Sequence, residues 1–455
     1  MEHKKGSLKS TIAVSLTNYL DAGAIVAGAS GLTLWQNYLG LTETHLGWLN
    51  AISANCFGAA IGAIIGGFLA DKYGRKTIYT YNMLVYMVGI AIIMFTVNFP
   101  MLLTGFLVTG ISVGAGVPAS WTYISENSEV GNRGRNMGIS QFAWGVGPTI
   151  ILLLGMLLAP GSADASAGVL YSYVEKIATF FTGNDTSAEA VRVFSSRLIF
   201  GSLFIVAFIA WTLQRKLNES KDWEEAKQAQ GSEKQPGVFA SFGTLFTNKV
   251  NIRTMIFLAG IYITWNMVAS VMGFFQQHIY ETAGGLSNGQ ANMVSAIQWI
   301  VIIAVTYFGF AMLVDKVNQR WFYFIGTLIG ISAWFILIFV GIKNYFALWT
   351  FTILWGTHAG LSVQAFYALW ASELFPAKYR AAAQGIMFFA VRGIAAAWGL
   401  VFVHIYGENG EGFNTAAYMM IGLLLIALII GTIWTPKTRG KTLQQITKER
   451  YGDNI

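Results

Sequence analysis

Two ionisable residues, Asp21 and Arg392, stand inside long apolar stretches of the sequence. An ionisable side chain within a membrane is costly and is a functional hypothesis by default. Burial favours the protonated form of a carboxyl group, so we predict that Asp21 binds and releases a proton. Arg392 suits a polar or anionic group of a substrate. Two alternatives are a structural Asp21 hydrogen-bonded to a neighbouring helix, and a direct Asp21–Arg392 ion pair that takes no part in proton transfer.

Uncharged amides occur in other apolar stretches, at Gln141, Asn266 and Gln364. An amide side chain both donates and accepts hydrogen bonds, so it can bind hydroxyl groups in either direction. In a dry environment each amide needs a partner. We predict that these three residues and Arg392 bind a small polar substrate. The alternative is that the amides form hydrogen bonds between helices.

A set of charged residues recurs in the two halves of the chain. An aspartate ends a Gly-rich apolar run at Asp71 and again at Asp315. A glutamate followed seven residues later by an arginine also occurs twice, at the same offset along the chain. Linked charges that repeat in this way indicate two copies of one unit, a transporter architecture. The residues expected to form a gate at the cytoplasmic helix ends are Asp71, Arg75, Glu126, Arg133, Asp315, Glu373 and Arg380.

The elements that position these residues are expected to be membrane helices. The 455 residues are 55% hydrophobic and only 11% charged, whereas a soluble domain carries about 25% charged residues. Apolar runs of about 18 residues or more are typical of membrane helices. The sequence therefore predicts an all-α membrane protein with twelve spans. The predicted spans are 12–37, 46–70, 77–97, 101–126, 135–159, 194–213, 251–282, 289–313, 320–342, 345–371, 380–406 and 413–434.

The positions of the basic residues predict how the chain is oriented. Most of the 29 lysines and arginines fall in loops that share one side if both termini are cytoplasmic, as the positive-inside rule requires. Residues 160–192 are then an outside loop, and we expect a location in the plasma membrane. The net charge of +7 is spread over several loops, which argues against nucleic acid as a partner. The single cysteine, Cys56, allows no intramolecular disulfide.

The expected organisation is two six-helix halves and two cytoplasmic segments. The halves are residues 1–213 and 251–434, residues 214–250 are a charged linker, and residues 435–455 are a tail. We expect no enzyme activity, cofactor or metal. The nearest approach to a phosphate-binding loop, residues 435–442, has a threonine where the first glycine belongs and follows an apolar run rather than a strand.

Several motifs resemble the major facilitator superfamily, and within it the sugar porter branch. Residues 67–76 resemble the loop motif between helices 2 and 3 of the superfamily, and residues 21–28 resemble the first-helix segment of sugar porters. Residues 123–126 with 133–135, 373–376 with 380, and 436–443 resemble three further motifs of the branch. The resemblance implies the twelve-helix fold of two halves and transport by alternating access.

The substrate pocket departs from that of the sugar porters. The glutamine pair of the family's seventh helix falls at Ile263 and Thr264, and the arginine that accompanies the first-helix acid falls at Phe106. The tryptophan that lines the sugar site falls at Arg392. Gln141 is the one sugar contact of the family that is kept at its position.

We therefore expect a monomeric secondary transporter in the lipid bilayer that moves a sugar, polyol or sugar acid together with a proton. Two alternatives stay open. Arg392 also suits an organic-anion:proton symporter, because a membrane arginine can bind a carboxylate. A protein of another class, a receptor or sensor that has this fold but does not transport, would bind the solute without accumulating it.

Overall fold

The computed structural model describes most of the chain. The described residues are 3–41, 45, 48–49, 52, 56–129, 131–160, 167–182, 187–229, 243, 245–286, 288–407 and 410–452. Helices and the turns between them make up this part of the chain, and it contains no strand. The fold is therefore all-α, as the composition predicts.

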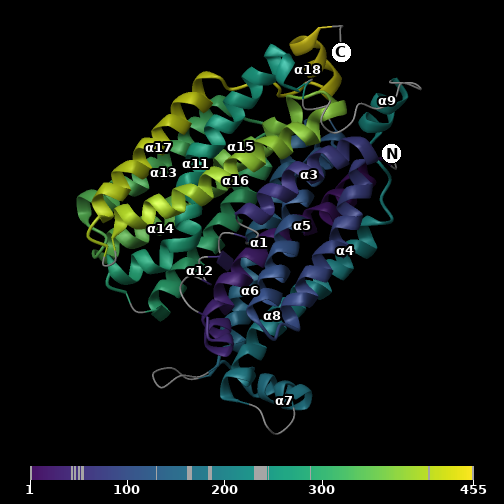
Figure 1. Cartoon of the computed structure of the whole chain (residues 1–455). Coiled ribbons are helices and arrows are strands. Elements are labelled where there is room, and N and C mark those ends of the chain that lie inside the picture. Colours follow the sequence, from purple (N-terminus) through teal and green to yellow (C-terminus); the bar gives the residue numbers. More distant parts are fainter. Residues whose placement is uncertain are drawn as a thin grey trace.

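Twelve long segments form the body of the molecule (Figure 1). The first six are α1 (His3–Leu39), α3 (Phe57–Tyr73), α4 (Arg75–Met94), α5 (Phe99–Glu126), α6 (Arg133–Leu158) and α8 (Ala188–Gln214). The second six are α11 (Lys249–Thr282), α12 (Asn288–Ala304) with η1 (Val305–Ala311), α13 (Gln319–Val340), α14 (Tyr345–Leu361) with α15 (Val363–Glu373), α16 (Arg380–Tyr406) and α17 (Phe413–Ile433). Shorter helices are α7 (Tyr171–Thr182), α9 (Lys221–Ala229), η2 (Ala377–Tyr379) and α18 (Leu443–Tyr451).

The helices match the spans predicted from hydropathy, with two differences. Most of residues 46–55, at the start of the second predicted span, lie outside the described residues. The tenth span is broken at Ser362, between α14 and α15. Nine helices in the described part of the chain are long and apolar enough to cross a membrane unaided. The other three spans are not among the nine. Helix α1 contains several polar residues, and α3 and α14 are each only 17 residues long.

Asparagine and serine begin several of these helices. The side chains of Asn98, Ser187, Asn248, Asn318 and Asn344 each accept a hydrogen bond from a backbone N–H of the first turn. Such caps satisfy donors that have no partner within the helix. They place the helix starts close to where the apolar runs begin.

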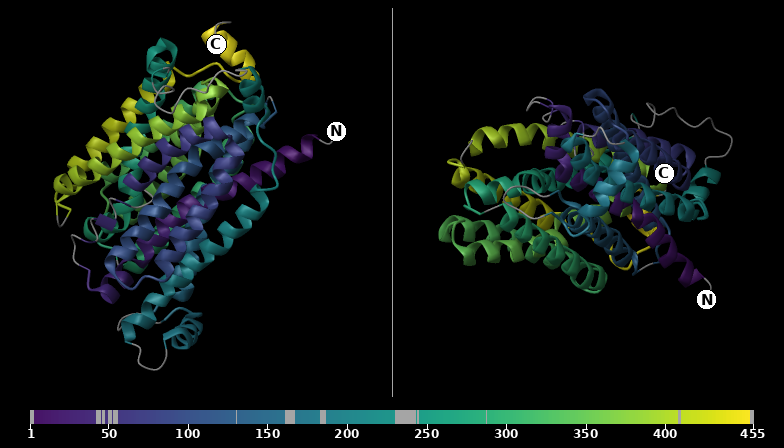
Figure 2. Two further views of the ribbon diagram at one scale, coloured as in Figure 1. Left: turned by 45° about the vertical axis from the view of Figure 1, so that its right-hand side comes forward. Right: turned by 90° about the horizontal axis from the view of Figure 1, so that it is seen from below.

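The two groups of six helices form adjacent bundles, as the two views of Figure 2 also show. Between the bundles, α3 packs against α16, and α6 packs against α12 and η1. Glycines allow this close approach. A Cβ added to Gly67 would lie 2.4 Å from the carbonyl oxygen of Ala381, and one added to Gly138 would lie 2.6 Å from the Cα atom of Ala311. The bundles therefore meet backbone to backbone.

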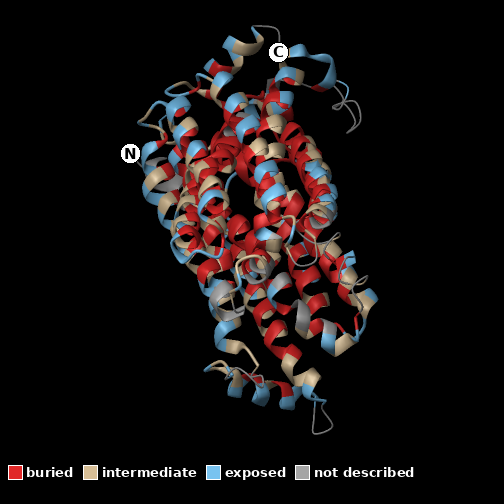
Figure 3. Cartoon of the chain, turned by 90° about the vertical axis from the view of Figure 1, so that its left-hand side faces the viewer, coloured by how far each residue is buried: buried red, intermediate tan, exposed pale blue. Residues whose placement is uncertain are grey.

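Large apolar side chains cover the outside of the bundles. Val88, Phe208, Ile325 and Ile429 are all more than half exposed, while the buried residues gather between the helices (Figure 3). An outward-facing apolar belt on a helical protein fits a hydrocarbon solvent. Helix α7 lies at one end of the bundles, called here the α7 end, and α9, α18 and the C-terminus lie at the opposite end, called the linker end (Figure 1).

Candidate functional site

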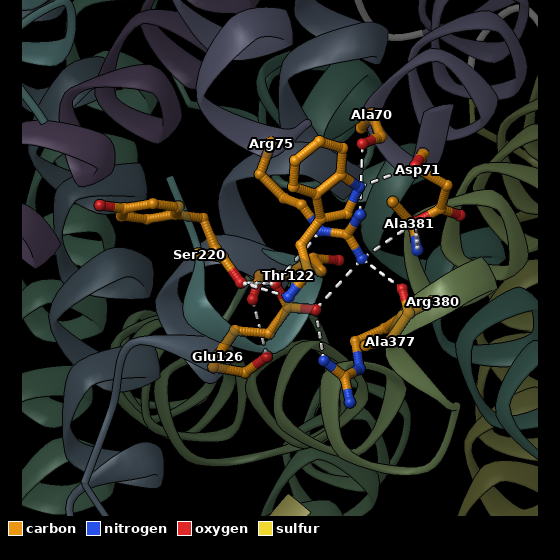
Figure 4. A network of polar contacts seen from close by, with 12 residues as sticks. Ala70, Asp71, Arg75, Thr122, Glu126, Ser220, Ala377, Arg380 and Ala381 are labelled. Atoms are coloured by element: carbon orange, nitrogen blue, oxygen red, sulfur yellow. Dashed lines mark hydrogen bonds and ion pairs between the residues drawn. The ribbon is translucent and has the colours of Figure 1, made fainter. Parts of the chain in front are cut away.

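Glu126 is the centre of a charged network at the linker end (Figure 4). Arg75 donates to Glu126 from Nε and from Nη2, at 3.1 Å in both cases. Arg380, which belongs to the other bundle, and Ser220, which follows α8, also donate to this carboxylate. Asp71 lies 3.0 Å from Nη2 of Arg75. The side chains of Arg75, Glu126 and Arg380 are all almost fully buried, so their charges depend on one another rather than on water.

Two aspartates bind the start of a helix in the opposite bundle. The carboxylate of Asp71 accepts from the backbone N–H groups of Ala381 and Ala382 at 3.3 Å and 2.6 Å, at the N-terminus of α16. Asp315 accepts from Gly134 and Arg135 at 3.1 Å and 2.8 Å, at the N-terminus of α6. A carboxylate is favoured there by the free N–H groups and by the helix dipole. The repeat seen in the sequence is thus a pair of matching contacts between the bundles.

A second ion pair crosses the same interface. Nη1 of Arg133 lies 3.0 Å from Oε1 of Glu373, and Nη2 of Arg133 donates to the carbonyl of Lys441 at 3.1 Å. Between the two ion-pair clusters, Ser125 donates to the carbonyl of Ser372 at 3.2 Å. All seven predicted gate residues therefore meet at the linker end. Each glutamate pairs across the interface, and the glutamate–arginine pairs close in the sequence do not pair with each other.

The linker contributes residues that sequence reasoning missed. Glu219 accepts from the backbone N–H of Lys76 at 3.1 Å, and Trp223 donates from Nε1 to the carbonyl of Asp71 at 2.8 Å. Ser220 is fully buried against Glu126. These residues stand in a charged stretch that is typical of a solvated connector, so local composition carried no signal of their contacts.

Burial changes the protonation of the carboxylates that lie outside the membrane spans. It raises the pKa of Glu219, and the hydrogen bonds from the N–H groups of Ser220 and Lys76 offset part of that rise. It also raises the pKa of Asp315, against the opposing effect of the N–H groups at the start of α6. Desolvation favours the neutral acid, whereas donors favour the anion.

Asp21 is completely buried in α1 near the middle of the molecule. Among the described residues, neither of its carboxylate oxygens has a hydrogen-bond partner. Arg392 of α16 lies within electrostatic range of Asp21, and its guanidinium stands 4.8 Å from the ring centroid of Phe388. No ion pair within 4.0 Å joins Asp21 to Arg392 in this conformation of the described chain. Phe106, which stands where the sugar porters have the arginine, packs against Gly28 and Phe200.

Two of the predicted substrate residues meet across the interface. Nε2 of Gln364 donates to Oε1 of Gln141 at 3.0 Å. The Nε2 of Gln141 is buried and has no hydrogen-bond partner within the described part of the chain. Gln364 stands one residue into α15, directly after the break at Ser362. The pair therefore links α6 to the interrupted tenth span and keeps one donor free.

The third amide, Asn266, is buried in α11. Within the described structure, no hydrogen bond joins it to Gln141 or Gln364. Its neighbour Trp265 donates from Nε1 to Nε2 of His358 at 2.9 Å, and Nδ1 of His358 is 2.8 Å from the carbonyl oxygen of Gly326. These two hydrogen bonds hold α11 against α13 and α14, and so fix the position of Asn266 along the bundle.

Aromatic rings fill the space between the amides and the gate. Tyr262 stacks on Tyr367 with ring centroids 4.1 Å apart. Trp121 meets Tyr367 at 6.0 Å and Phe388 at 6.4 Å, both edge to face. The four residues come from α5, α11, α15 and α16. Such a group can cover the C–H face of a small ring, while its tyrosine and tryptophan polar atoms remain able to bond.

Comparison with known proteins agrees with this geometry. The family model described as Major Facilitator Superfamily matches residues 11–400. The chain belongs to the major facilitator superfamily. It is 38% identical over 449 residues to the "Minor myo-inositol transporter IolF" of Bacillus subtilis (strain 168), a match that covers 98% of this chain and 94% of that protein. Superfamily membership makes the protein a multi-pass membrane transporter and not an enzyme.

Solved structures of the superfamily share the fold. The proton:xylose symporter XylE bound to 6-bromo-6-deoxy-D-glucose superposes with a TM-score of 0.76 at 17% identity, covering 98% of this chain and 99% of that one. The transporter FucP in the outward conformation gives a TM-score of 0.72 at 14% identity, covering 94% and 99%. The fold of twelve helices predicted from hydropathy is confirmed.

Proposed function

We propose that this protein is a secondary transporter that takes up a polyol or sugar together with a proton. The observation that carries the proposal is the uncharged amide pair of Gln141 and Gln364, which joins the two bundles at 3.0 Å. A neutral solute rich in hydroxyl groups can replace that bond with bonds to both amides, because each amide donates and accepts. Asn266 and Arg392, which are buried in α11 and α16, are proposed to supply further polar groups to the substrate.

The relatives support this class of substrate. IolF is described as a myo-inositol transporter and XylE as a proton:xylose symporter. A cyclic polyol such as myo-inositol has hydroxyls around its rim and C–H bonds on its faces. Amides suit the rim, and the rings of Tyr262, Tyr367 and Phe388 suit the faces.

Asp21 is the proposed proton site. A carboxyl group that is fully buried without a hydrogen-bond donor is more stable when protonated, and the nearby Arg392 favours the charged form. Movement of Arg392 with its bundle would therefore change the proton affinity of Asp21. This is the account of a proton carrier, not of a fixed ion pair.

The two bundles are proposed to move against each other as units, residues 1–213 and 251–434, with 214–250 and 435–455 as the segments that connect and clasp them. The seven gate residues hold the linker end closed. We further propose that the linker end is cytoplasmic, that the protein works as a monomer, and that it resides in the plasma membrane. The positive-inside distribution of lysine and arginine supports the orientation.

The function is tested by uptake into proteoliposomes with an imposed pH gradient. Radiolabelled myo-inositol and xylose are compared with a small carboxylate of similar size. Accumulation of a polyol or sugar that dissipates the pH gradient supports the proposal. Accumulation of the carboxylate alone identifies an organic-anion symporter, and saturable binding without accumulation identifies a sensor.

Asp21→Asn separates the two accounts of proton coupling. Because exchange needs no net proton movement, the variant should lose pH-driven accumulation and keep substrate counterflow. Arg392→Ala should weaken binding in both assays, since loss of a charged hydrogen bond costs about 1.5–3 kcal/mol. Loss of counterflow in Asp21→Asn, together with wild-type uptake that ignores the pH gradient, would identify a facilitator with a structural acid.

A further inference from the structure

A layer of buried polar groups lies between the substrate amides and the gate. Gln384 of α16 is 2% exposed. Neither its Oε1 nor its Nε2 has a hydrogen-bond partner in the described structure. The same holds, among the described residues, for Nε1 of Trp121, Oγ1 of Thr122 and the hydroxyl of Tyr367. These four residues, from α5, α15 and α16, are called here the inner polar cluster.

Helix geometry places the cluster along the path to the linker end. Gln384 stands one turn from Arg380 of the gate and one turn from Phe388, because residues four apart share a helix face. Thr122 likewise stands one turn from Glu126. The ring of Trp121 contacts both Phe388 and Tyr367. The cluster therefore shares Trp121 and Tyr367 with the aromatic rings and extends from them, along Gln384 and Thr122, to the charged network.

Unpaired polar groups make this layer costly while the linker end is closed. Nearly all buried polar groups in proteins have hydrogen-bond partners, and each exception calls for an explanation. Five unpaired atoms in one layer between the bundles are explained if their partner arrives in another state of the transport cycle. When the bundles separate at the linker end, the layer lines the opening route.

We propose that Gln384, with Trp121 and Tyr367, forms a second subsite that binds the hydroxyl groups of the substrate on its way out at the linker end. This inference rests on the proposed function. It names a residue outside the proposed substrate site of Gln141, Asn266, Gln364 and Arg392, called here the upper site. The Gln384 amide can bind two neighbouring hydroxyls, one as donor and one as acceptor. The stacked rings of Tyr262 and Tyr367 continue the surface on which the substrate ring slides.

The subsite predicts an effect on one face of the membrane. Gln384→Leu should raise the half-saturation concentration of myo-inositol about 3- to 10-fold at the linker face, the amount expected for one or two neutral hydrogen bonds. The value at the α7 face should change less than about twofold, because the upper site keeps its amides. The measurement uses right-side-out and inside-out vesicles with labelled myo-inositol. Gln384→Asn, which keeps a shorter amide, should recover part of the loss.

Thermal unfolding separates this role from a structural one. Gln214, a fully buried glutamine of α8, donates to the carbonyl of Ala13 at 3.0 Å, so Gln214→Leu should lower Tm and leave the ratio of the two half-saturation values unchanged. Gln384→Leu should not lower Tm, because no partner is lost. Equal changes on both faces, no change on either, or a fall in Tm like that of Gln214→Leu would overturn the subsite. A wild type that moves no polyol would refute the proposed function instead, and the Tm comparison would still test whether Gln384 is unpaired.

Discussion

Replacing Glu126 by glutamine should open the linker end far more than the same change at Glu373. Glu126→Gln removes the carboxylate that two arginines share, and among the described residues Arg380 then keeps its bond to the carbonyl of Phe375. Arg75 keeps its pairing with Asp71. Leaving one member of a buried pair without its partner costs about 3–5 kcal/mol. The Arg133–Glu373 pair is also buried, but only one arginine loses its partner and Arg133 keeps its bond to the carbonyl of Lys441, so Glu373→Gln should cost less, about 1.5–3 kcal/mol for one charged hydrogen bond.

These energies predict a visible shift between states. Inverting a 99:1 equilibrium takes about 5.5 kcal/mol, so a loss of about 3–5 kcal/mol gives the open state a large share. Spin labels at Arg135 and Lys378, exposed positions on opposite bundles, report the separation of the bundles by pulsed electron resonance. Longer distances should dominate in Glu126→Gln and form a smaller population in Glu373→Gln, while counterflow continues in both.

If Glu126→Gln leaves the distance distribution unchanged, or if both variants shift it equally, charge pairing does not hold the linker end closed. The backbone packing of α3 on α16 and of α6 on η1 would then carry the closure. Unfolding of both variants, seen as loss of counterflow and of a sharp melting transition, would place the network in folding rather than gating.

Three further predictions follow from single positions. Ser172, exposed on α7, should react as cysteine with an impermeant thiol reagent on intact cells in a Cys56→Ser background; labelling only after permeabilisation reverses the proposed orientation. A Cβ at Gly385 would lie 2.2 Å from a carbonyl oxygen of the other bundle, so Gly385→Ala should slow transport with little fall in Tm. A Cβ at Gly62 would lie 1.9 Å from a carbonyl oxygen of its own bundle, so Gly62→Ala should reduce the free energy of unfolding by about 1–3 kcal/mol and lower Tm. Burial raises the pKa of Glu219, so the anion is disfavoured in the folded state and stability is lost as pH rises through that pKa. Glu219→Gln should therefore melt at a higher temperature than wild type at pH 8, and this gain should vanish at pH 4. A gain in Tm that grows on acidification would contradict the burial argument.

Hydropathy and charge order were enough to predict the spans and the position of the repeated charges at helix ends. In a bilayer each span must satisfy its own backbone hydrogen bonds, so a local apolar run already specifies a helix. A charge that ends such a run is placed at a helix end for the same reason. The start and end of predicted spans such as 380–406 and 251–282 therefore agree closely with α16 and α11.

Which side chains meet was decided only by the packing of the two bundles. Glu126 pairs with Arg75 and Arg380 rather than with Arg133, seven residues away, because α5 and α16 approach across the interface. Gln364 reaches Gln141 for the same reason. Such contacts join residues hundreds of positions apart, and their geometry depends on close helix crossings that no local pattern encodes.

The inner polar cluster was predictable from the sequence only in part. Gln384 was visible in the sequence as an uncharged polar residue within the predicted span 380–406, and that alone could have marked it. Its lack of a partner, however, is a property of the folded bundles, in which Trp121 contacts both Tyr367 and Phe388, the residue one turn from Gln384. An amide in a membrane span must bond with something, and only the tertiary structure reveals that its partner is absent from this state.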